Sequence, residues 1–310
     1  MAVSTTLTQT ITSPAWEPIT LPAEGAYSLS RHSLRRPRPC QDSAIRGQES
    51  DAIIRDLAIT ISQRGVCVFP GQKNLTVADQ KLLCHRLGQL TTRPYTSGLN
   101  IHPLNQTELP DGTIDAELTT LAIASTRPKK KLVQQAGFGK KEKKQSHSDG
   151  WHTDCSYENI PADYTMLHMK VTPASGGDTL FASAYEAYDL LSPSMAKMLE
   201  RCQATFMPPG HRPENIVDRM WKGPRGAPEN VGPELRATHP AVRTNPVTGW
   251  KSLYAMGHHL EAIEGLGDLE NRMVLELLER LLVDNHQLQL RVKWEADDLV
   301  IWDNRAVYHV

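Results

Sequence analysis

Apolar residues recur at helical spacing in two stretches of the first third of the chain. Residues 49–65, ESDAIIRDLAITISQRG, show this spacing and end at Gly65, a residue that favours the C-terminus of a helix. In residues 76–90, TVADQKLLCHRLGQL, Thr76 is a suitable N-cap for an amphipathic helix. Between these two stretches, VCVFPG is rich in β-branched and aromatic residues and closes with Pro-Gly, which predicts a short strand.

The second half of the chain shows the alternation of apolar and polar residues that is typical of strands. Residues 162–173 are predicted to form one strand, and residues 175–183 are predicted to form a turn followed by another. Residues 236–256 predict a hairpin around the turn Asn245–Gly249, because Asn, Pro and Gly cluster there between two apolar runs.

Two helices interrupt these strands, and further strands end the chain. Residues 184–202 and 270–286 have helical spacing, and residues 288–310 predict two strands around a turn at Asp297-Asp298. Many short strands with few helices between them favour a double-sheet β core with helices against one face. We therefore predict a mainly β, α+β fold in one domain over residues 46–310.

The composition is that of a soluble enzyme and argues against several other classes of protein. A formal net charge of −1 gives no overall field that would attract nucleic acid or a membrane surface. The five cysteines are an odd number without CxxC spacing, which argues against a disulfide framework and a cysteine-based zinc site. Cys67 lies in the apolar run GVCVF and is predicted to be buried.

The N-terminal segment differs in composition from the rest of the chain. Residues 1–45 are rich in Ser, Thr and Pro and carry the basic patch RHSLRRPRP, which predicts a poorly ordered arm. The first residues lack the basic and apolar regions of a signal peptide, and no apolar run reaches the length of a membrane span. We expect a cytoplasmic protein with no membrane partner.

A basic segment, RPKKKLVQQAGFGKKEKKQS, occupies residues 127–146. Its Lys residues and glycines favour a solvated loop. The alternative is a lid beside the active site, because the segment leads directly into a His-x-Asp pair. A nucleic-acid surface is less favoured, since Phe138 is the only aromatic residue among the basic ones.

The stretch SDGWHTDCSY contains His152 and Asp154, two residues apart. They are either polar residues of an exposed loop or two ligands of an iron ion. On a β segment, residues i and i+2 point the same way, so both side chains could bind one ion, with Cys155 on the opposite face. Two His and one carboxylate on one side of Fe(II) are typical of oxygen-activating enzymes. A second His from a distant strand would complete such a site.

Several further motifs occur with this pair, and together they resemble one family. In order, GWHTDCSY, PADYTMLHMKVTPASGGDTLFAS, HPAVRTNPVTGWKSLY and VKWEADDLVIWDNRAVYHV resemble the taurine dioxygenase family, and its fungal members in particular. RGVCVFPGQ and LTVADQ fit the family's first strand and helix. The resemblance therefore runs from about Arg64 to the last residue.

The resemblance implies a fold, a reaction and a set of cofactors. Family members are Fe(II)- and 2-oxoglutarate-dependent dioxygenases with a double-stranded β-helix (jelly-roll) core. It implies Fe(II), 2-oxoglutarate and O2 for this chain, and hydroxylation of a small, anionic, sulfonate-like substrate with release of succinate and CO2. It also implies a homo-oligomer, and no nucleic-acid partner.

Matched by position, three residues resemble the metal ligands of the family: His152, Asp154 and the distal His309. Neither these motifs nor their neighbours offer the HExxH-like arrangement that a zinc hydrolase would need for its general base. The resemblance thus implies an iron centre with catalytic and metal-binding roles for these three side chains.

Three other residues receive roles from the resemblance. Thr179 in GGDTL matches the Thr that binds the far carboxylate of 2-oxoglutarate, with bonding of its own Gly-Gly-Asp turn as the alternative. Trp151 matches an aromatic residue beside the substrate. His102 in LNIHPL resembles a substrate-contacting His, with a surface His as the alternative. The tandem His258-His259 is predicted to be structural, because neighbours on a strand face opposite ways.

The chain departs from the family pattern after His309. The family has an Arg shortly past the distal His that pairs with 2-oxoglutarate, whereas only Val310 follows here. Arg243 and Arg305 do not match that Arg, and Arg305 is expected to support the local strand and turn. We therefore expect a C-terminally truncated member that lacks the last strand or strands. The alternative is a degenerate metal-binding homologue without turnover.

Overall fold

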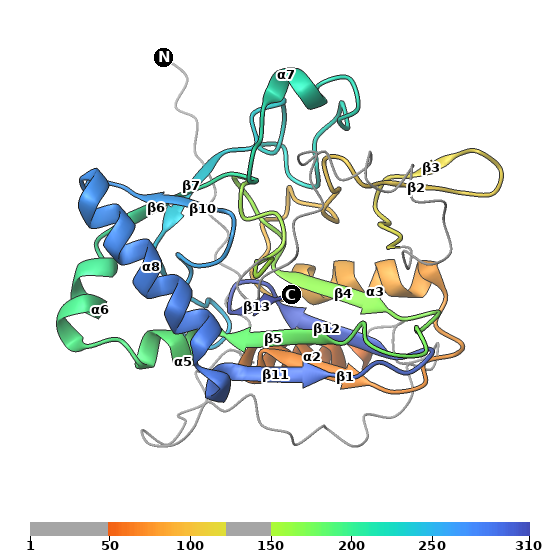
Figure 1. Ribbon diagram of the computed structural model, residues 1–310. Helices are drawn as coiled ribbons and strands as arrows, with labels where there is room; N and C mark the ends of the chain where they lie inside the picture. The colour runs from red at the N-terminus through yellow and green to blue at the C-terminus, as the bar shows by residue number, and fades with distance from the viewer. Residues whose placement is uncertain (1–48, 122–149) are drawn as a thin grey trace, which may run out of the picture.

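The strand β12 (Leu299–Asp303) is the central strand of a three-stranded sheet. The computed structural model describes residues 49–121 and 150–310 (Figure 1), so the predicted arm at 1–45 and the basic segment at 127–146 lie outside the described residues. The strand pairs with β1 (Val66–Phe69) on one side and with β4 (Tyr164–His168) on the other, and all five of its residues are buried because both faces of the sheet are covered. Strands that are covered on both faces have continuous apolar runs, as the sequence LVIW does here.

The two faces of this sheet contact different layers. Leu299 and Ile301 face the helices α2 (Glu49–Arg64) and α3 (Val77–Gln89), which pack against the sheet in Figure 1. Val300 and Trp302, which alternate with them, belong to a second cluster on the inner face. The helices at residues 49–65 and 76–90 and the strand in VCVFPG are thereby confirmed, as is Thr76 as the N-cap of α3.

A second sheet faces the first across this inner cluster. Its order is β11 (Gln289–Val292), β5 (Thr179–Ser183) and β13 (Val307–His309), all antiparallel. Phe181 of β5 packs with Trp302 of β12, with ring centroids 5.4 Å apart. The two sheets thus form the β sandwich that a jelly roll requires.

The prediction for residues 288–310 was partly wrong. The segment forms three strands rather than two, and β11 and β12 belong to different sheets instead of pairing with each other. The predicted turn does occur, with Asp297 at φ 66°, but it carries the chain from one sheet to the other. The partners of both strands are distant in sequence, so local alternation could not identify them.

The helix predicted over residues 184–202 is divided in two. The structure has α5 (Ala184–Asp189) and α6 (Pro193–Leu199). Ser192 caps α6 by accepting a bond from the backbone N–H of Met195, and Pro193 occupies the first turn, where its missing N–H is tolerated. Ser-Pro therefore begins a helix here and does not continue one.

The remaining elements form an outer layer and a cap. The hairpin predicted around Asn245–Gly249 is present, and the helix predicted at 270–286 is α8 (Asp268–Asp284). In Figure 1 the segments that carry β2, β3 and α7 lie above the two sheets. The remaining elements are β2 (Thr107–Glu108), β3 (Ile114–Asp115), β6 (Gln203–Phe206), α7 (Pro213–Ile216), β7 (Ala237–Pro240), β8 (Val242–Thr244), β9 (Lys251–Leu253), β10 (Leu260–Ile263) and the 3-10 helix His286–Leu288.

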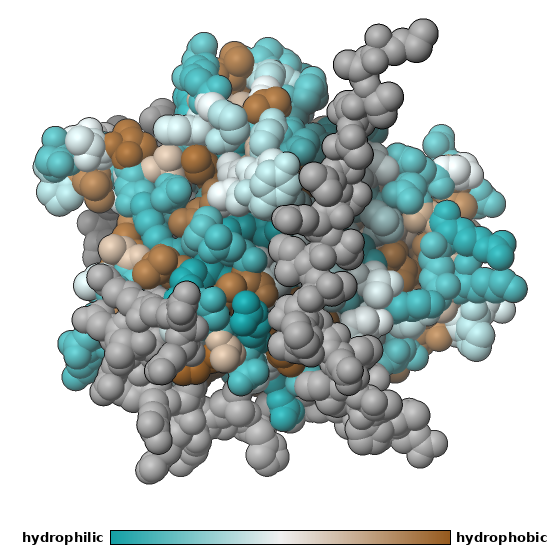
Figure 2. Space-filling view, turned by 180° about the vertical axis from the view of Figure 1, so that it is seen from behind, coloured by the Kyte–Doolittle hydropathy of each residue, from teal (hydrophilic) through white to brown (hydrophobic). Residues whose placement is uncertain are grey.

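The cysteines and the surface agree with the sequence. Cys67 is buried, as predicted, and its burial raises the pKa of the thiol to about 12. The four cysteines in the described residues are free thiols. Apolar residues on the face in Figure 2 are scattered among hydrophilic ones wherever grey atoms do not cover it. Within residues 49–121 and 150–310, no helix is both long and apolar enough to span a bilayer.

A buried ion pair holds the turn between β12 and β13. The Arg305 guanidinium donates to both oxygens of Asp303, at 2.8 and 2.7 Å, and its carbon lies 4.8 Å above the ring centroid of Tyr164. Asn245 donates a further bond to Asp303, at 2.9 Å. The expectation that Arg305 supports this strand and turn is confirmed.

Replacing Arg305 with Met is expected to lower the free energy of unfolding by about 3–5 kcal/mol, because it leaves the buried Asp303 carboxylate without its cation. The matched control is Arg280→Met in the exposed Glu276–Arg280 pair, where the expected loss is below about 0.5 kcal/mol. Urea unfolding followed by tryptophan fluorescence measures both changes. Equal losses in the two variants would contradict the assigned role.

Candidate metal centre

Two of the three predicted ligands are joined by their own backbones. The N–H of His152 donates to the carbonyl of His309 at 3.0 Å, and the N–H of His309 donates to the carbonyl of His152 at 2.9 Å. This isolated antiparallel bridge extends the pairing of β13 with β5 onto the segment that carries the His-x-Asp pair. Segments far apart in sequence therefore present their imidazoles side by side, with ring centroids 4.3 Å apart.

The prediction that the pair lies on a β segment holds only for its first member. His152 makes the single bridge, whereas Asp154 already lies in a turn, and Cys155 has a φ of 50°. The turn therefore begins at Asp154 itself. Cys155 accordingly lines the same cavity as His152 and Asp154 and does not occupy the opposite face.

Asn304 fixes the position of Asp154. Its side-chain oxygen accepts from the N–H of Asp154 at 2.7 Å, and its amide donates to the carbonyls of Asp154 and Ala162 at 2.9 and 3.1 Å. Asn304 is fully buried in the turn between β12 and β13. The turn that leads into β13 and its ligand His309 thus also fixes the backbone of the carboxylate ligand.

The three side chains converge in the manner that a divalent cation needs. One ligand atom of each of His152, Asp154 and His309 lies within 4.8 Å of the others. The Nε2 atoms of the two imidazoles lie 3.6 and 3.7 Å from Oδ1 of Asp154. Two imidazoles and one carboxylate form the donor set of non-haem Fe(II) oxygenases.

The tautomer of His152 also suits a metal. Its Nδ1 lies 2.6 Å from the carbonyl of Gly150, so Nδ1 carries the hydrogen and donates it. The lone pair of Nε2 is then available to the ion. A metal-bound imidazole commonly donates its other N–H to a backbone carbonyl in this way. The residues present therefore fit a divalent iron ion.

Electrostatics favour the ligand forms of Asp154 and His309. Burial opposes ionisation of Asp154, but His309 and the hydrogen-bonded His152 outweigh it and hold the carboxyl pKa below its usual range. Burial lowers the pKa of His309 to about 4, although Asp154 favours its charged form. Burial also opposes charge on His152, yet Asp154 and the Gly150 carbonyl raise its pKa overall.

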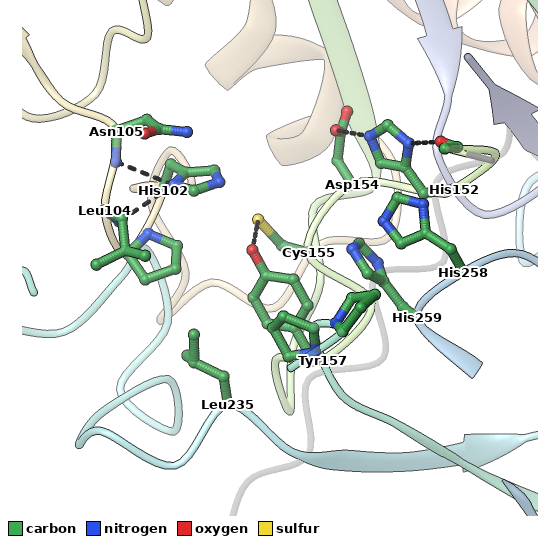
Figure 3. A pocket seen from close by; sticks show the side chains of 14 residues that line it. His102, Leu104, Asn105, His152, Asp154, Cys155, Tyr157, Leu235, His258 and His259 are labelled. Atoms are coloured by element: carbon green, nitrogen blue, oxygen red, sulfur yellow. Dashed lines mark hydrogen bonds and ion pairs between the residues drawn. The ribbon is translucent and has the colours of Figure 1, made fainter. Parts of the chain in front are cut away.

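A cavity of about 410 Å³ is lined by two of the three ligands, His152 and Asp154 (Figure 3). Its lining residues lie in loops, bends and turns, apart from His152, which makes the isolated bridge with His309. Much of the wall is apolar. These apolar residues are Pro103, Leu104, Tyr157, Pro208, Pro209 and Leu235.

The structure places His102 in this cavity, across from the ligands in Figure 3. Its Nδ1 accepts bonds from the backbone N–H groups of Leu104 and Asn105, at 3.1 and 3.0 Å. Burial lowers the pKa of His102 to about 4, so the ring is neutral and its hydrogen is on Nε2. His102 therefore brings an N–H donor to the site, while contact with substrate stays a prediction.

Trp151 and Thr179 are not brought to the cavity. Trp151 is 3% exposed and packs in a core cluster, outside the residues that line the cavity. Thr179 begins β5, and its hydroxyl accepts a bond from the indole N–H of Trp294 at 3.0 Å. The predicted contacts of Trp151 with substrate and of Thr179 with cosubstrate stay predictions.

The sequence did not reveal two features of the site. Asn304 lies in the quoted motif WDNRAVYHV, but nothing local shows that it bonds a residue 150 positions away. His258 and His259 line the cavity, although strand alternation predicted a structural role for them. Gly257, directly before them, was the available signal of a turn at this position.

Replacing Asn304 with Ala is expected to weaken Mn(II) binding about 10- to 100-fold, because residues that orient metal ligands typically have effects of this size. Asn285→Ala is the matched control, since the Asn285 side chain donates to the carbonyl of Leu281 at the end of α8, away from the three ligands, and its loss should leave affinity unchanged. Calorimetric titration of both variants with Mn(II) provides the test. An Asn304 variant with wild-type affinity would refute the positioning role.

Known proteins resemble this chain in sequence and in structure. The chain is 42% identical over 269 residues to the alpha-ketoglutarate-dependent dioxygenase btcD of Neocamarosporium betae, covering 84% of this chain and 77% of that protein. It is 39% identical over 298 residues to esdpJ of Penicillium shearii, a protein with the same description, covering 86% and 78%. An alpha-ketoglutarate-dependent sulfonate dioxygenase of Saccharomyces cerevisiae is 34% identical over 265 residues, covering 84% and 57%.

The comparison with solved structures confirms the jelly-roll prediction. The crystal structure of a taurine dioxygenase from Burkholderia xenovorans matches with a TM-score of 0.60 at 22% identity, covering 86% of this chain and 74% of that one. At this identity the likeness shows the fold alone, and a truncation of this chain stays a prediction. The family model described as Taurine catabolism dioxygenase TauD, TfdA family, matches residues 42–310, and the chain therefore belongs to this family of 2-oxoglutarate-dependent dioxygenases.

Proposed function

We propose that this protein is an Fe(II)-dependent dioxygenase that couples 2-oxoglutarate and O2 to the hydroxylation of a small organic molecule, with release of succinate and CO2. One observation supports this above all: His152, Asp154 and His309 bring their ligand atoms within 4.8 Å of one another beside a cavity. Iron bound there would supply the activation of O2 that accompanies oxidative decarboxylation of 2-oxoglutarate. The protein would position and orient the reactants and exclude water from them.

The protein's own groups have separate tasks in this proposal. His152, Asp154 and His309 hold the ion, while the Gly150 carbonyl and the Asn304 amide orient two of them. Three protein ligands leave the other coordination positions for cosubstrate and O2. The apolar walls of the cavity exclude water from the reacting carbon, which protects the activated state from side reactions.

Thr179 is proposed to bind the far carboxylate of 2-oxoglutarate. Its oxygen already accepts the N–H of Trp294, so the hydroxyl proton remains available for donation. Thr179 lies on the same face of β5 as Phe181, whose ring centroid is 6.0 Å from that of His309. Because His309 pairs directly with Phe181, Thr179 and His309 are on the same face of this sheet, which supports a cosubstrate that extends from the ion toward Thr179.

The proposed substrate is a small molecule, and a sulfonate-like anion is the starting proposal. The similar yeast protein is named a sulfonate dioxygenase, which supports this class. His102, with its N–H directed by two backbone bonds to Nδ1, is the proposed hydrogen-bond donor to that substrate. A cytoplasmic location and a homo-oligomer remain predictions from the sequence.

The test is production of succinate from 2-oxoglutarate by the Fe(II)-loaded protein in air. His152→Ala and Asp154→Ala are expected to reduce it to background and to remove iron binding, because each variant lacks one of the three ligands. His286→Ala, at an exposed His outside the site, is the matched control and should retain full activity.

Two outcomes would contradict the proposal. Iron uptake without any succinate from the unaltered protein would favour the metal-binding homologue without turnover. Undiminished succinate from either ligand variant would show that the reaction depends on another site.

A further inference from the structure

Two adjacent imidazoles, those of His258 and His259, line the cavity next to the predicted ligands (Figure 3). They lie in a turn that precedes β10, so the alternation of a strand does not separate them. The N–H of His258 donates to the carbonyl of Trp151 at 2.8 Å. The turn is thus fastened to the residue directly before His152.

Gly257 sets how closely this turn approaches the ligands. It has a φ of 76°, and a Cβ at this position would lie 2.6 Å from the carbonyl oxygen of Trp151 and 3.0 Å from the Tyr308 ring. Only glycine combines this conformation with this contact. The backbone of this turn is therefore fixed relative to the segment that carries His152.

The rings form a continuous wall that starts at the ligands. His258 stacks on His152, with centroids 5.1 Å apart and planes 26° apart. His259 meets His258 edge-on at 4.4 Å, and Tyr157 meets His259 edge-on at 4.9 Å. One side of the cavity is therefore aromatic from the metal centre to Tyr157.

His259 adds a polar atom to this wall. It is 8% exposed, and its Nδ1 lies 2.9 Å from the hydroxyl of Ser156, which fixes the ring. Among the described residues, no group bonds its Nε2. That nitrogen is consequently available to a molecule in the cavity.

The cavity is also lined by aliphatic residues, namely Pro103, Leu104, Pro208, Pro209 and Leu235. In the described lining, no Lys or Arg offers a fixed positive charge. The volume of about 410 Å³ is within the range of roughly 300–1,000 Å³ found for pockets that enclose drug-sized ligands. A two-carbon sulfonate such as taurine would fill only part of this space.

We propose that His258 and His259 contact the substrate directly and select a molecule with a flat, apolar body, specifically an aryl group, that packs against their rings and the aliphatic lining of the cavity. The inference rests on the proposed function, which makes this cavity the substrate site. Aromatic rings gain from edge-on and offset contacts with other rings beyond the burial of apolar area. Nε2 of His259 bonds a polar group on the same molecule.

The test compares two sulfonates that differ in one substituent: taurine and 2-phenylethanesulfonate. Isothermal titration calorimetry on the full chain with Mn(II) gives the affinity for each. The phenyl compound is expected to bind more tightly by about tenfold or more, since tenfold in Kd is a modest gain for one buried ring. Equal affinities, tighter binding of taurine, or no binding of the phenyl compound would overturn the proposal.

The double variant His258→Ala/His259→Ala assigns the effect to these residues. It is expected to lose about tenfold in affinity for the phenyl compound, with taurine changed less than about threefold. If the double variant fails to fold, His259→Gln replaces it, because this change removes the ring but keeps a polar atom near Ser156. His259→Gln is also expected to lose the preference for the phenyl compound. His286→Ala is the control. An intact preference in the folded His variants would overturn the assignment.

Binding is measured without turnover, which separates this proposal from the proposed function. A phenyl preference that depends on His258 and His259, in a protein that forms no succinate, would support the substrate contact and contradict the oxygenase activity. Succinate formation without a phenyl preference would support the oxygenase activity and contradict the substrate contact.

Discussion

The reciprocal backbone bridge between His152 and His309 is the interaction on which the metal centre depends. It joins residues that are 309 − 152 = 157 positions apart, by bonds of 3.0 and 2.9 Å. Because the bridge continues the pairing of β13 with β5, the position of both imidazoles follows from the register of that sheet. A shift of one residue in the register of β13 would turn His309 to the other face of the sheet, and the three ligands would no longer converge.

The turn between β12 and β13 connects this bridge to the core. Asp303 and Arg305 form a buried pair that fixes the turn, while Asn304 between them binds the backbone of Asp154. Buried charged groups rarely add net stability compared with apolar residues of the same shape, because desolvation is costly. Here they give the turn one geometry, and that geometry places the carboxylate ligand beside the two imidazoles.

The sequence predicted the features that local chemistry determines. The cap at Thr76, the apolar run of β12, the hairpin around Asn245–Gly249 and the His-x-Asp pair all depend on residues close together in the chain. The split at Pro193 was missed, because a helical pattern alone does not show whether a proline continues a helix or begins one.

Other features depend on distant partners, which periodicity does not contain. The separation of β11 and β12 into different sheets and the bond from Asn304 to Asp154 belong to this group. His258 and His259 were predicted to face opposite ways on a strand, whereas they lie in a turn after Gly257 and both line the cavity.

The most direct measurement of the shared metal centre is an anomalous difference map from crystals soaked in Mn(II). One peak within bonding distance of His152, Asp154 and His309 is predicted, whereas a peak elsewhere, or none among these three side chains, would contradict it.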